Sequence, residues 1–191
     1  RSSAIVRDGR LLAPANSPRD ASPLAFCRPG SDHRFTEYFQ LGRGMQAVVY
    51  DPRTGQIDNI PTCMGVDHNI FGDEEDKPIY YGLNSALGWI STEVWDETHD
   101  PEAAQGWCPA VLDTNGDGVI TEWTEPDEPI DPMKDHRIQF GCYSVSASPS
   151  DGTLWCSGIS RTDNKLVRID RGDSPPESCT AEVFEPPELD T

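Results

Sequence analysis

Glycine and proline recur so often along this chain that few segments are long enough to form a regular helix. The sequence has 16 Gly and 17 Pro in 191 residues, and both residue types tend to end or bend regular elements. The segments between them are short, and several alternate apolar with polar residues, as strands with one buried face do. The sequence therefore predicts an all-β protein, with residues 1–191 forming a single domain.

The clearest alternation lies in two parts of the chain. Residues 45–60 form a predicted hairpin around an Asp51–Gly55 turn, and residues 143–170 form a predicted meander of short antiparallel strands. Only residues 93–104 have helical character, and Pro101 interrupts them. Further short strands are expected at residues 69–72, 79–83, 88–94 and 182–185.

The charge and the short apolar runs of the chain exclude a nucleic acid partner and a membrane span, respectively. There are 33 acidic and 15 basic residues, which gives a formal net charge of −18. Such a chain repels the phosphate backbone of a nucleic acid, and it offers no stripe of Lys and Arg that could replace the bound counterions. Its longest apolar runs are far shorter than a bilayer requires. We therefore expect neither a nucleic acid partner nor a membrane span.

The six cysteines indicate an oxidising compartment. They stand at positions 27, 63, 108, 142, 156 and 179, and no two have the C-x-x-C spacing of zinc or redox motifs. An even number of dispersed cysteines favours disulfides and hence an extracellular or periplasmic protein, the alternative being small buried thiols. Cys142 and Cys156 flank the predicted hairpin and can face each other. The other pairings stay open, because six cysteines allow fifteen connectivities.

Several segments share one order of elements: an apolar strand, a turn of the Asp-Gly or Asp-x-x-Gly kind, a strand with Trp, and a strand ending in Asp. The segments with this order or with related motifs are Phe26–His33, Val49–Gly55, Gln105–Trp107, Leu112–Gly118, Pro149–Trp155, Leu166–Asp170 and Ala181–Pro187. They resemble blades of secreted bacterial β-propeller proteins of the streptogramin-lyase-like and NHL-like group. The resemblance implies a β-propeller of four-stranded antiparallel blades.

The length of the chain limits how many blades it can hold. A blade takes about 40 to 45 residues and a propeller has about 4 to 8 blades, whereas this chain has two clear blades, a possible third, and a loop-rich insertion at residues 95–137. One interpretation is a partial propeller, completed by another polypeptide or within a larger assembly. The alternative is a small β-sandwich with propeller-like hairpins.

The insertion contains a motif typical of EF-hand calcium loops. Residues 113–121 follow the pattern D-x-N-x-D-G, with Gly118 at the sharp turn and Ile120 as the apolar anchor. This spacing places several hard oxygen atoms around one point, as calcium requires. The candidate ligands are Asp113, Asn115, Asp117, the Val119 carbonyl, Thr121 and Glu125.

The motif departs from the EF-hand pattern at its twelfth position. Thr124 stands where a bidentate Glu is usual, with Glu122 two residues earlier and Glu125 one residue later. No convincing helix precedes the loop, because Pro109 lies four residues before Asp113. We therefore expect an isolated calcium site with a structural role. The alternative is a solvated Asp/Asn/Gly turn without an ion.

Two histidines are candidates for catalysis. His33 and His68 each follow an Asp, and the family resemblance implies that a His can act as general base beside a second metal in the propeller channel. The alternative for each is a hydrogen-bonded histidine near a loop surface. Two functions follow: a secreted, calcium-stabilised propeller that acts as a binding or structural module, or a metal-assisted lyase or hydrolase of the streptogramin-lyase-like kind.

Overall fold

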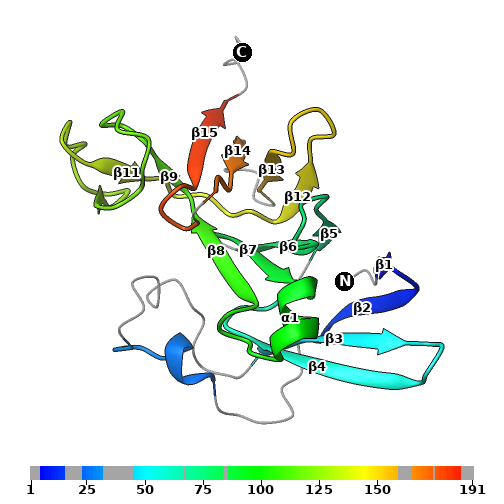
Figure 1. Ribbon diagram of the computed structural model, residues 1–191. Helices are drawn as coiled ribbons and strands as arrows, with labels where there is room; N and C mark the ends of the chain where they lie inside the picture. Colours follow the sequence, from blue (N-terminus) through cyan, green and yellow to red (C-terminus); the bar gives the residue numbers. More distant parts are fainter. Residues whose placement is uncertain are drawn as a thin grey trace.

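The structure is a computed structural model, and it describes residues 5–15, 23–31, 45–66, 68–83, 86–158, 165–173 and 175–185. Within these residues the chain forms four β-sheets, one short α-helix and one 3-10 turn (Figure 1). The prediction of an all-β fold is therefore confirmed. The described part of the chain contains no helix with the length and hydrophobicity needed to cross a membrane.

Three of the sheets have the same topology: four antiparallel strands that pair in chain order. The N-terminal sheet contains β1 (Ile5–Arg7), β2 (Arg10–Ala15), β3 (Met45–Asp51) and β4 (Gln56–Thr62). The central sheet contains β5 (Ile70–Phe71), β6 (Pro78–Leu83), β7 (Ala86–Ser91) and β8 (Gln105–Pro109). The C-terminal sheet contains β12 (Ser144–Ala147), β13 (Leu154–Ser157), β14 (Leu166–Asp170) and β15 (Thr180–Phe184). Among the described residues, these sheets form an open series and no closed ring.

The fourth sheet is smaller and lies in the predicted insertion. This insertion sheet contains β9 (Val111–Leu112), β10 (Trp123–Thr124) and β11 (Asp135–Arg137). β11 is its middle strand, antiparallel to β9 and parallel to β10. The predicted insertion began at residue 95, but β8 pairs with β7 and so belongs to the central sheet.

The helix α1 (Thr92–Thr98) replaces the second half of a predicted strand. The prediction of a strand over residues 88–94 is wrong beyond Ser91, because the Ser91 hydroxyl accepts a hydrogen bond from the Val94 amide at 3.1 Å and caps the helix. His99 ends the helix in a left-handed conformation. The 3-10 turn covers Ala25–Cys27.

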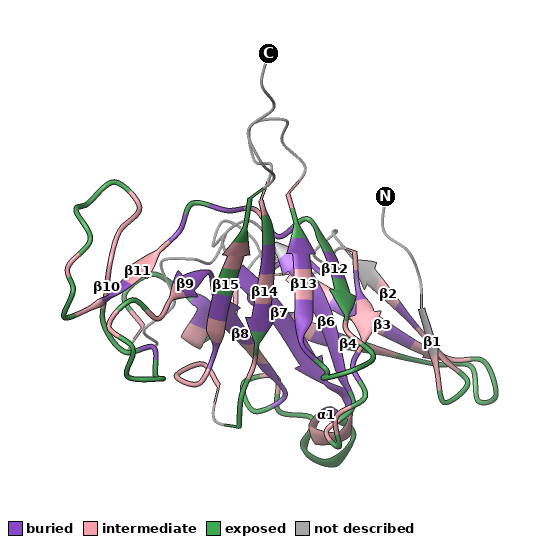
Figure 2. Cartoon of the chain, turned by 90° about the horizontal axis from the view of Figure 1, so that it is seen from above, coloured by how far each residue is buried: buried purple, intermediate pink, exposed green. Residues whose placement is uncertain are grey.

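The core consists of two apolar clusters, one on each face of the central sheet. Side chains alternate between the faces of a strand, so Tyr81 and Ile90 pack with the N-terminal sheet whereas Tyr80 and Leu87 pack with the C-terminal sheet. All six residues of β7 are buried, and Figure 2 shows β6 and β7 in the colour of buried residues. The central sheet is therefore the middle layer of three.

The described residues form three disulfides, and no described cysteine is free. The predicted pair Cys142–Cys156 is confirmed. Cys108–Cys179 joins β8 to the residue before β15, and Cys27–Cys63 joins the 3-10 turn to the end of β4. These bonds fit an extracellular or periplasmic protein.

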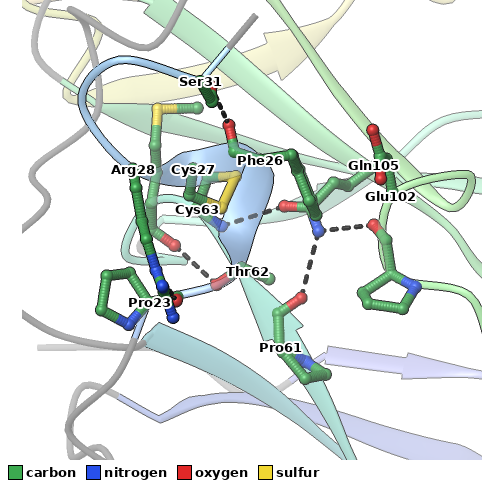
Figure 3. The surroundings of a disulfide bond; sticks show 12 residues. Pro23, Phe26, Cys27, Arg28, Ser31, Pro61, Thr62, Cys63, Glu102 and Gln105 are labelled. Atoms are coloured by element: carbon green, nitrogen blue, oxygen red, sulfur yellow. Dashed lines mark hydrogen bonds between the residues drawn. A yellow bond between two sulfur atoms is a disulfide. The ribbon is translucent and has the colours of Figure 1, made fainter. Parts of the chain in front are cut away.

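Figure 3 shows how the Cys27–Cys63 bond is tied to the central sheet. The Gln105 side chain, on β8, accepts a hydrogen bond from the Cys63 amide at 3.0 Å. Its amide group donates to the carbonyls of Pro61 and Pro101, at 3.1 and 2.6 Å. A single buried amide therefore links the end of β4 to the central sheet.

Candidate metal centre

The register of the insertion sheet brings two acidic residues together that are distant in sequence. Leu112 pairs with His136 and Val111 pairs with Arg137 in the antiparallel pair of β9 and β11. Continuing this register by one residue places Asp113, the first residue of the predicted calcium loop, opposite Asp135. Asp135 therefore joins the loop as a carboxylate supplied by a neighbouring strand.

The loop itself is folded by its own polar side chains. The Asp113 carboxylate accepts hydrogen bonds from the amides of Gly116 and Gly118, at 2.7 and 2.9 Å. Asn115 and Asp117 each accept a bond from the backbone amide two residues further on, both at 2.9 Å. Gly116 and Gly118 have φ values of +77° and +79°, which residues with a Cβ rarely adopt. The sequence pattern thus produces a tight turn with its carboxylates held in place.

Asp135 is the one fully buried carboxylate of this group, with 0% of its surface exposed. One of its oxygens, Oδ2, accepts a hydrogen bond from the Thr121 amide at 3.4 Å, and the other, Oδ1, has no hydrogen-bond partner. A buried carboxylate oxygen without a partner is strongly unfavourable unless a cation or a proton compensates it. Burial raises the pKa of Asp135, and the nearby charges of Asp113 and Asp117 raise it further.

The three carboxylates converge on a single point. Asp113, Asp117 and Asp135 each offer an oxygen atom, and these atoms all lie within 4.8 Å of one another. Among the described residues this is the only group that brings three or more potential metal ligands together. Three carboxylates, with the Asn115 amide oxygen close by in the same loop, form a hard, negatively charged donor set that could hold a metal ion.

The remaining predicted ligands have other contacts. Thr121 is exposed, and its backbone amide donates a hydrogen bond to the Asp135 carboxylate. Val119 is 41% exposed, and its backbone amide donates a hydrogen bond to the Asp117 carboxylate. The Glu125 carboxylate accepts hydrogen bonds from the Trp123 indole at 3.1 Å and from the Arg137 guanidinium, with which it forms an ion pair.

Sequence reasoning missed Asp135, because no fixed spacing connects it to the loop. The missing Glu at the twelfth position signalled that a ligand had to come from elsewhere. The isolated sequence could not identify which acidic residue supplies it, since the strand pairing between β9 and β11 makes that choice.

The loop is anchored to the body of the protein on its far side. Ile120, the predicted apolar anchor, is 0% exposed, and its amide donates to the Glu177 carbonyl at 2.7 Å. Glu177 lies two residues before Cys179, whose disulfide leads to β8. The candidate metal centre is therefore connected to both the central and the C-terminal sheets.

His68, one of the two predicted catalytic histidines, is not part of this group of ligands. His68 is half-buried in the left-handed region, with φ of +46°, and its ring centroid lies 4.2 Å from that of Tyr143. His33 lies outside the described residues. The structure therefore gives no geometry that relates His33 to His68.

A second acidic region lies between the central and C-terminal sheets. It lines a cavity of about 550 Å³ with six carboxylates and the Arg171 guanidinium. Arg171 forms a two-bonded ion pair with Asp76, at 3.1 and 3.2 Å, and lies over the Trp89 ring. The six carboxylates belong to Glu74, Glu75, Asp76, Asp151, Asp170 and Asp173.

The two acidic regions differ in how their charge is compensated. In the cavity a cation is supplied by the chain itself, because Arg171 neutralises Asp76. Glu74 in the cavity and Asp135 at the candidate metal centre each have a buried oxygen without a hydrogen-bond partner, but among the described residues only that of Asp135 belongs to a group of three converging carboxylates. The centre at Asp135 is therefore the stronger candidate for an external cation.

Comparisons of the chain with protein-family models, with curated proteins and with solved structures find no match.

Proposed function

We propose that the chain is a calcium-stabilised β-propeller module of a secreted protein, with a binding or structural role. The observation that carries the calcium part is the unpartnered, fully buried Asp135 oxygen beside Asp113 and Asp117. Calcium prefers six to eight oxygen ligands and tolerates irregular geometry. The three carboxylates, the Asn115 amide and the Val119 carbonyl would supply such a shell, with water completing it.

The propeller part is supported by topology. The N-terminal, central and C-terminal sheets are all four-stranded antiparallel meanders with strands in chain order, as propeller blades are. The central sheet is covered on both faces by its neighbours, and β12 of the C-terminal sheet lies beside β5 and β6. Three blades are fewer than a closed propeller has, so the module would be completed by further sheets.

A structural role for the ion follows from its place in the fold. The insertion sheet has strands of only two or three residues, and it therefore has few backbone pairs of its own. An ion bound by Asp113, Asp117 and Asp135 would cross-link the loop to β11, and Ile120 would hold that assembly against the body of the protein. Extracellular calcium is abundant enough to fill a weak site of this kind, with a Kd of about 10⁻⁴ to 10⁻³ M.

Calorimetric titration of the chelator-treated protein with calcium tests this proposal. We expect one ion per chain, and a loss of affinity of about tenfold or more in Asp135→Asn, which loses a charged ligand. Asp127→Asn is the matched control, because Asp127 is an exposed acidic residue of the same insertion outside the metal-ligand group. A wild-type protein that binds no calcium, or equal affinities of wild type and Asp135→Asn, would refute the proposal.

The enzyme hypothesis is the second candidate, and His68 is the observation that favours it. A non-glycine residue in the left-handed region is uncommon and such residues cluster at functional sites. Metal analysis of the purified protein separates the two functions. Calcium alone favours the module, whereas a second metal whose binding is lost in His68→Ala favours the lyase or hydrolase.

A further inference from the structure

The loop at the candidate metal centre contains a chemically reactive pair of residues. Of the six asparagines in the sequence, only Asn115 is followed by a glycine, Gly116. In such a pair the backbone nitrogen of the glycine can attack the side-chain amide of the asparagine, because glycine has no side chain that shields its nitrogen or restricts its backbone. Asn115 is therefore the asparagine of this chain most susceptible to deamidation.

Both reacting groups are held by hydrogen bonds within the loop. The Gly116 amide donates to the Asp113 carboxylate at 2.7 Å, and the Asn115 side-chain oxygen Oδ1 accepts from the Asp117 amide at 2.9 Å. The attack requires the Gly116 nitrogen to give up the proton that it shares with Asp113, and the Asn115 Cγ atom to reach that nitrogen. The folded turn therefore protects Asn115.

Packing contributes little to holding Gly116 in this position. The residue is exposed, and among the described residues outside its chain neighbours no heavy atom lies within 4 Å of the place that a Cβ would occupy. The same is true of Gly118, whose amide also donates to Asp113, at 2.9 Å. The shape of the turn therefore depends on where the Asp113 carboxylate lies.

The position of the Asp113 carboxylate depends in turn on a cation. Asp113, Asp117 and Asp135 each offer an oxygen atom, and these atoms lie within 4.8 Å of one another, so the three carboxylates repel one another when no cation is bound. A bound calcium ion would hold them together and could take the Asn115 oxygen as a further ligand. Loss of the ion should therefore let the turn open transiently and release the Gly116 amide from Asp113.

We propose that Asn115 is a site of covalent modification, which calcium protects and which deamidates when the ion is lost. This inference rests on the calcium site of the proposed function. In the reaction the Gly116 nitrogen gives its proton to the solvent and forms a bond to the Asn115 Cγ atom. The bond between Cγ and Nδ2 breaks, and Nδ2 takes up a proton and leaves as ammonia. The product is a cyclic succinimide, and no group is oxidised or reduced.

Water opens the succinimide ring in one of two ways. Hydrolysis of the bond between Cγ and the Gly116 nitrogen gives an aspartate at position 115 and keeps the spacing of the loop. Hydrolysis of the bond between the main-chain carbonyl carbon of residue 115 and that nitrogen gives isoaspartate, in which the main chain runs through Cγ and is one atom longer. The longer chain moves the Gly116 amide away from Asp113, so the isoaspartate form should bind calcium more weakly. A chain that has lost its ion would thereby lose the site permanently.

Mass-spectrometric peptide mapping after prolonged incubation tests the inference on the 191-residue chain. Because only the calcium-free loop should react, the rate at Asn115 should follow the calcium-free fraction, which is about 1% at a calcium concentration about 100 times Kd. We therefore expect deamidation to be about tenfold or more slower in that buffer than in chelator. Asn59 and Asn69, each followed by Ile, are internal controls that should stay largely unmodified in both buffers.

Variants with altered calcium affinity sharpen the test. Asp135→Asn, with an affinity lower by about tenfold, should have a calcium-free fraction about tenfold larger in the same calcium buffer. Its rate at Asn115, relative to its own rate in chelator, should therefore exceed that of wild type about tenfold. Asp127→Asn, the matched control, should behave like wild type.

Three results would overturn the inference. The first is a rate at Asn115 that is as high in calcium as in chelator, and the second is an unmodified Asn115 in chelator. Calcium titration of the fresh protein separates these results from failure of the proposed function, because either one in a protein that binds calcium leaves the calcium site intact. The third result, a protein that binds no calcium, overturns the calcium site and the inference together.

Discussion

The central sheet and the insertion sheet are neighbours in sequence, but they are stabilised by different interactions. Every residue of β7 in the central sheet is buried, and apolar clusters cover both faces of that sheet. The insertion sheet has strands of two or three residues, and its long loops expose Ile130 and Met133 by 62% and 81%. Its most buried polar feature is a carboxylate oxygen without a partner.

The central sheet is therefore stabilised by apolar burial, whereas we expect the insertion sheet to require a bound cation for its stability. Apolar burial stabilises the central sheet with or without calcium, because the hydrophobic effect acts without a ligand. The insertion sheet has three converging carboxylates that repel one another until a cation joins them. Calcium should therefore affect the insertion strongly and the central sheet only indirectly.

The largest effect on the free energy of unfolding is expected from a substitution that creates a cavity beside the central sheet. Leu87 is 0% exposed and packs in the cluster shared with the C-terminal sheet, so Leu87→Ala should lower the free energy of unfolding by about 2 to 5 kcal/mol. The loss should be the same in calcium and in chelator when measured by denaturant unfolding. Met133→Ala, at an exposed position of the insertion, should change stability by less than about 0.5 kcal/mol. A loss for Leu87→Ala that depends on calcium would contradict the separation of the two regions.

A comparable effect is expected from the Cys108–Cys179 disulfide, which joins β8 of the central sheet to the residue before β15. Replacing Cys108 and Cys179 by Ala opens a loop of 71 residues and should cost about 2 to 5 kcal/mol. Calcium affinity should fall too, because Glu177, which holds Ile120 of the metal loop, lies beside Cys179.

The Cys27–Cys63 bond is the matched control for this variant. It lies between the 3-10 turn and β4, far along the chain from the insertion. Its replacement by two alanines should lower stability and leave calcium affinity unchanged in the same titration. Equal calcium affinities in both double variants would show that the metal loop does not depend on the Cys108–Cys179 connection.

A still smaller effect is expected from Glu125, the acidic residue nearest the twelfth loop position. Its carboxylate is occupied by Trp123 and Arg137, so Glu125→Gln should reduce stability by no more than about 1 kcal/mol, as for other partly exposed ion pairs. Calcium affinity should change by less than about twofold, because a charge outside the metal site acts on the ion only through a screened electrostatic interaction. An affinity loss as large as that of Asp135→Asn would mean that Glu125 moves into the metal site on binding.

The smallest effect is expected from the Asp51 carboxylate, which is already paired with the Arg53 guanidinium. Hydrogen bonds from Arg53 lower the pKa of Asp51 from 3.8 to about 2. Because the folded-state pKa is depressed, its contribution is present above pH 4 and is lost as the pH falls from about 4 to about 2. Acid unfolding of Asp51→Asn should be less steep than that of wild type in this range. An identical acid transition in the two proteins would contradict this assignment.

Local patterns in the sequence predicted the features that depend on neighbouring residues. Alternation identified the hairpin around Asp51–Gly55 and the C-terminal meander, and the hairpin geometry identified the Cys142–Cys156 pair. The D-x-N-x-D-G spacing placed Asp113 and Asp117 in one turn. Each of these features is determined within a short stretch of chain.

Features that depend on long-range pairing could not be predicted in this way. Asp135 joins the metal centre only through the register of β9 and β11, and the Cys108–Cys179 bond requires the central and C-terminal sheets to be in place. The start of α1 was missed because the capping residue Ser91 directly follows the apolar run of β7, and the sequence pattern did not show that the strand ends there.

The most direct test of the account compares thermal unfolding of wild type and Asp135→Asn, each in saturating calcium and in chelator. At a calcium concentration about 100 times Kd, binding stabilises wild type by about 2.7 kcal/mol, which corresponds to a rise in Tm of roughly 5 to 10 °C. Asp135→Asn, with an affinity lower by about tenfold or more, should show about half of this rise or less. In chelator it should be at least as stable as wild type, because it lacks the unpaired buried charge. The same calcium-dependent rise in both proteins would contradict the claim that Asp135 completes a calcium site.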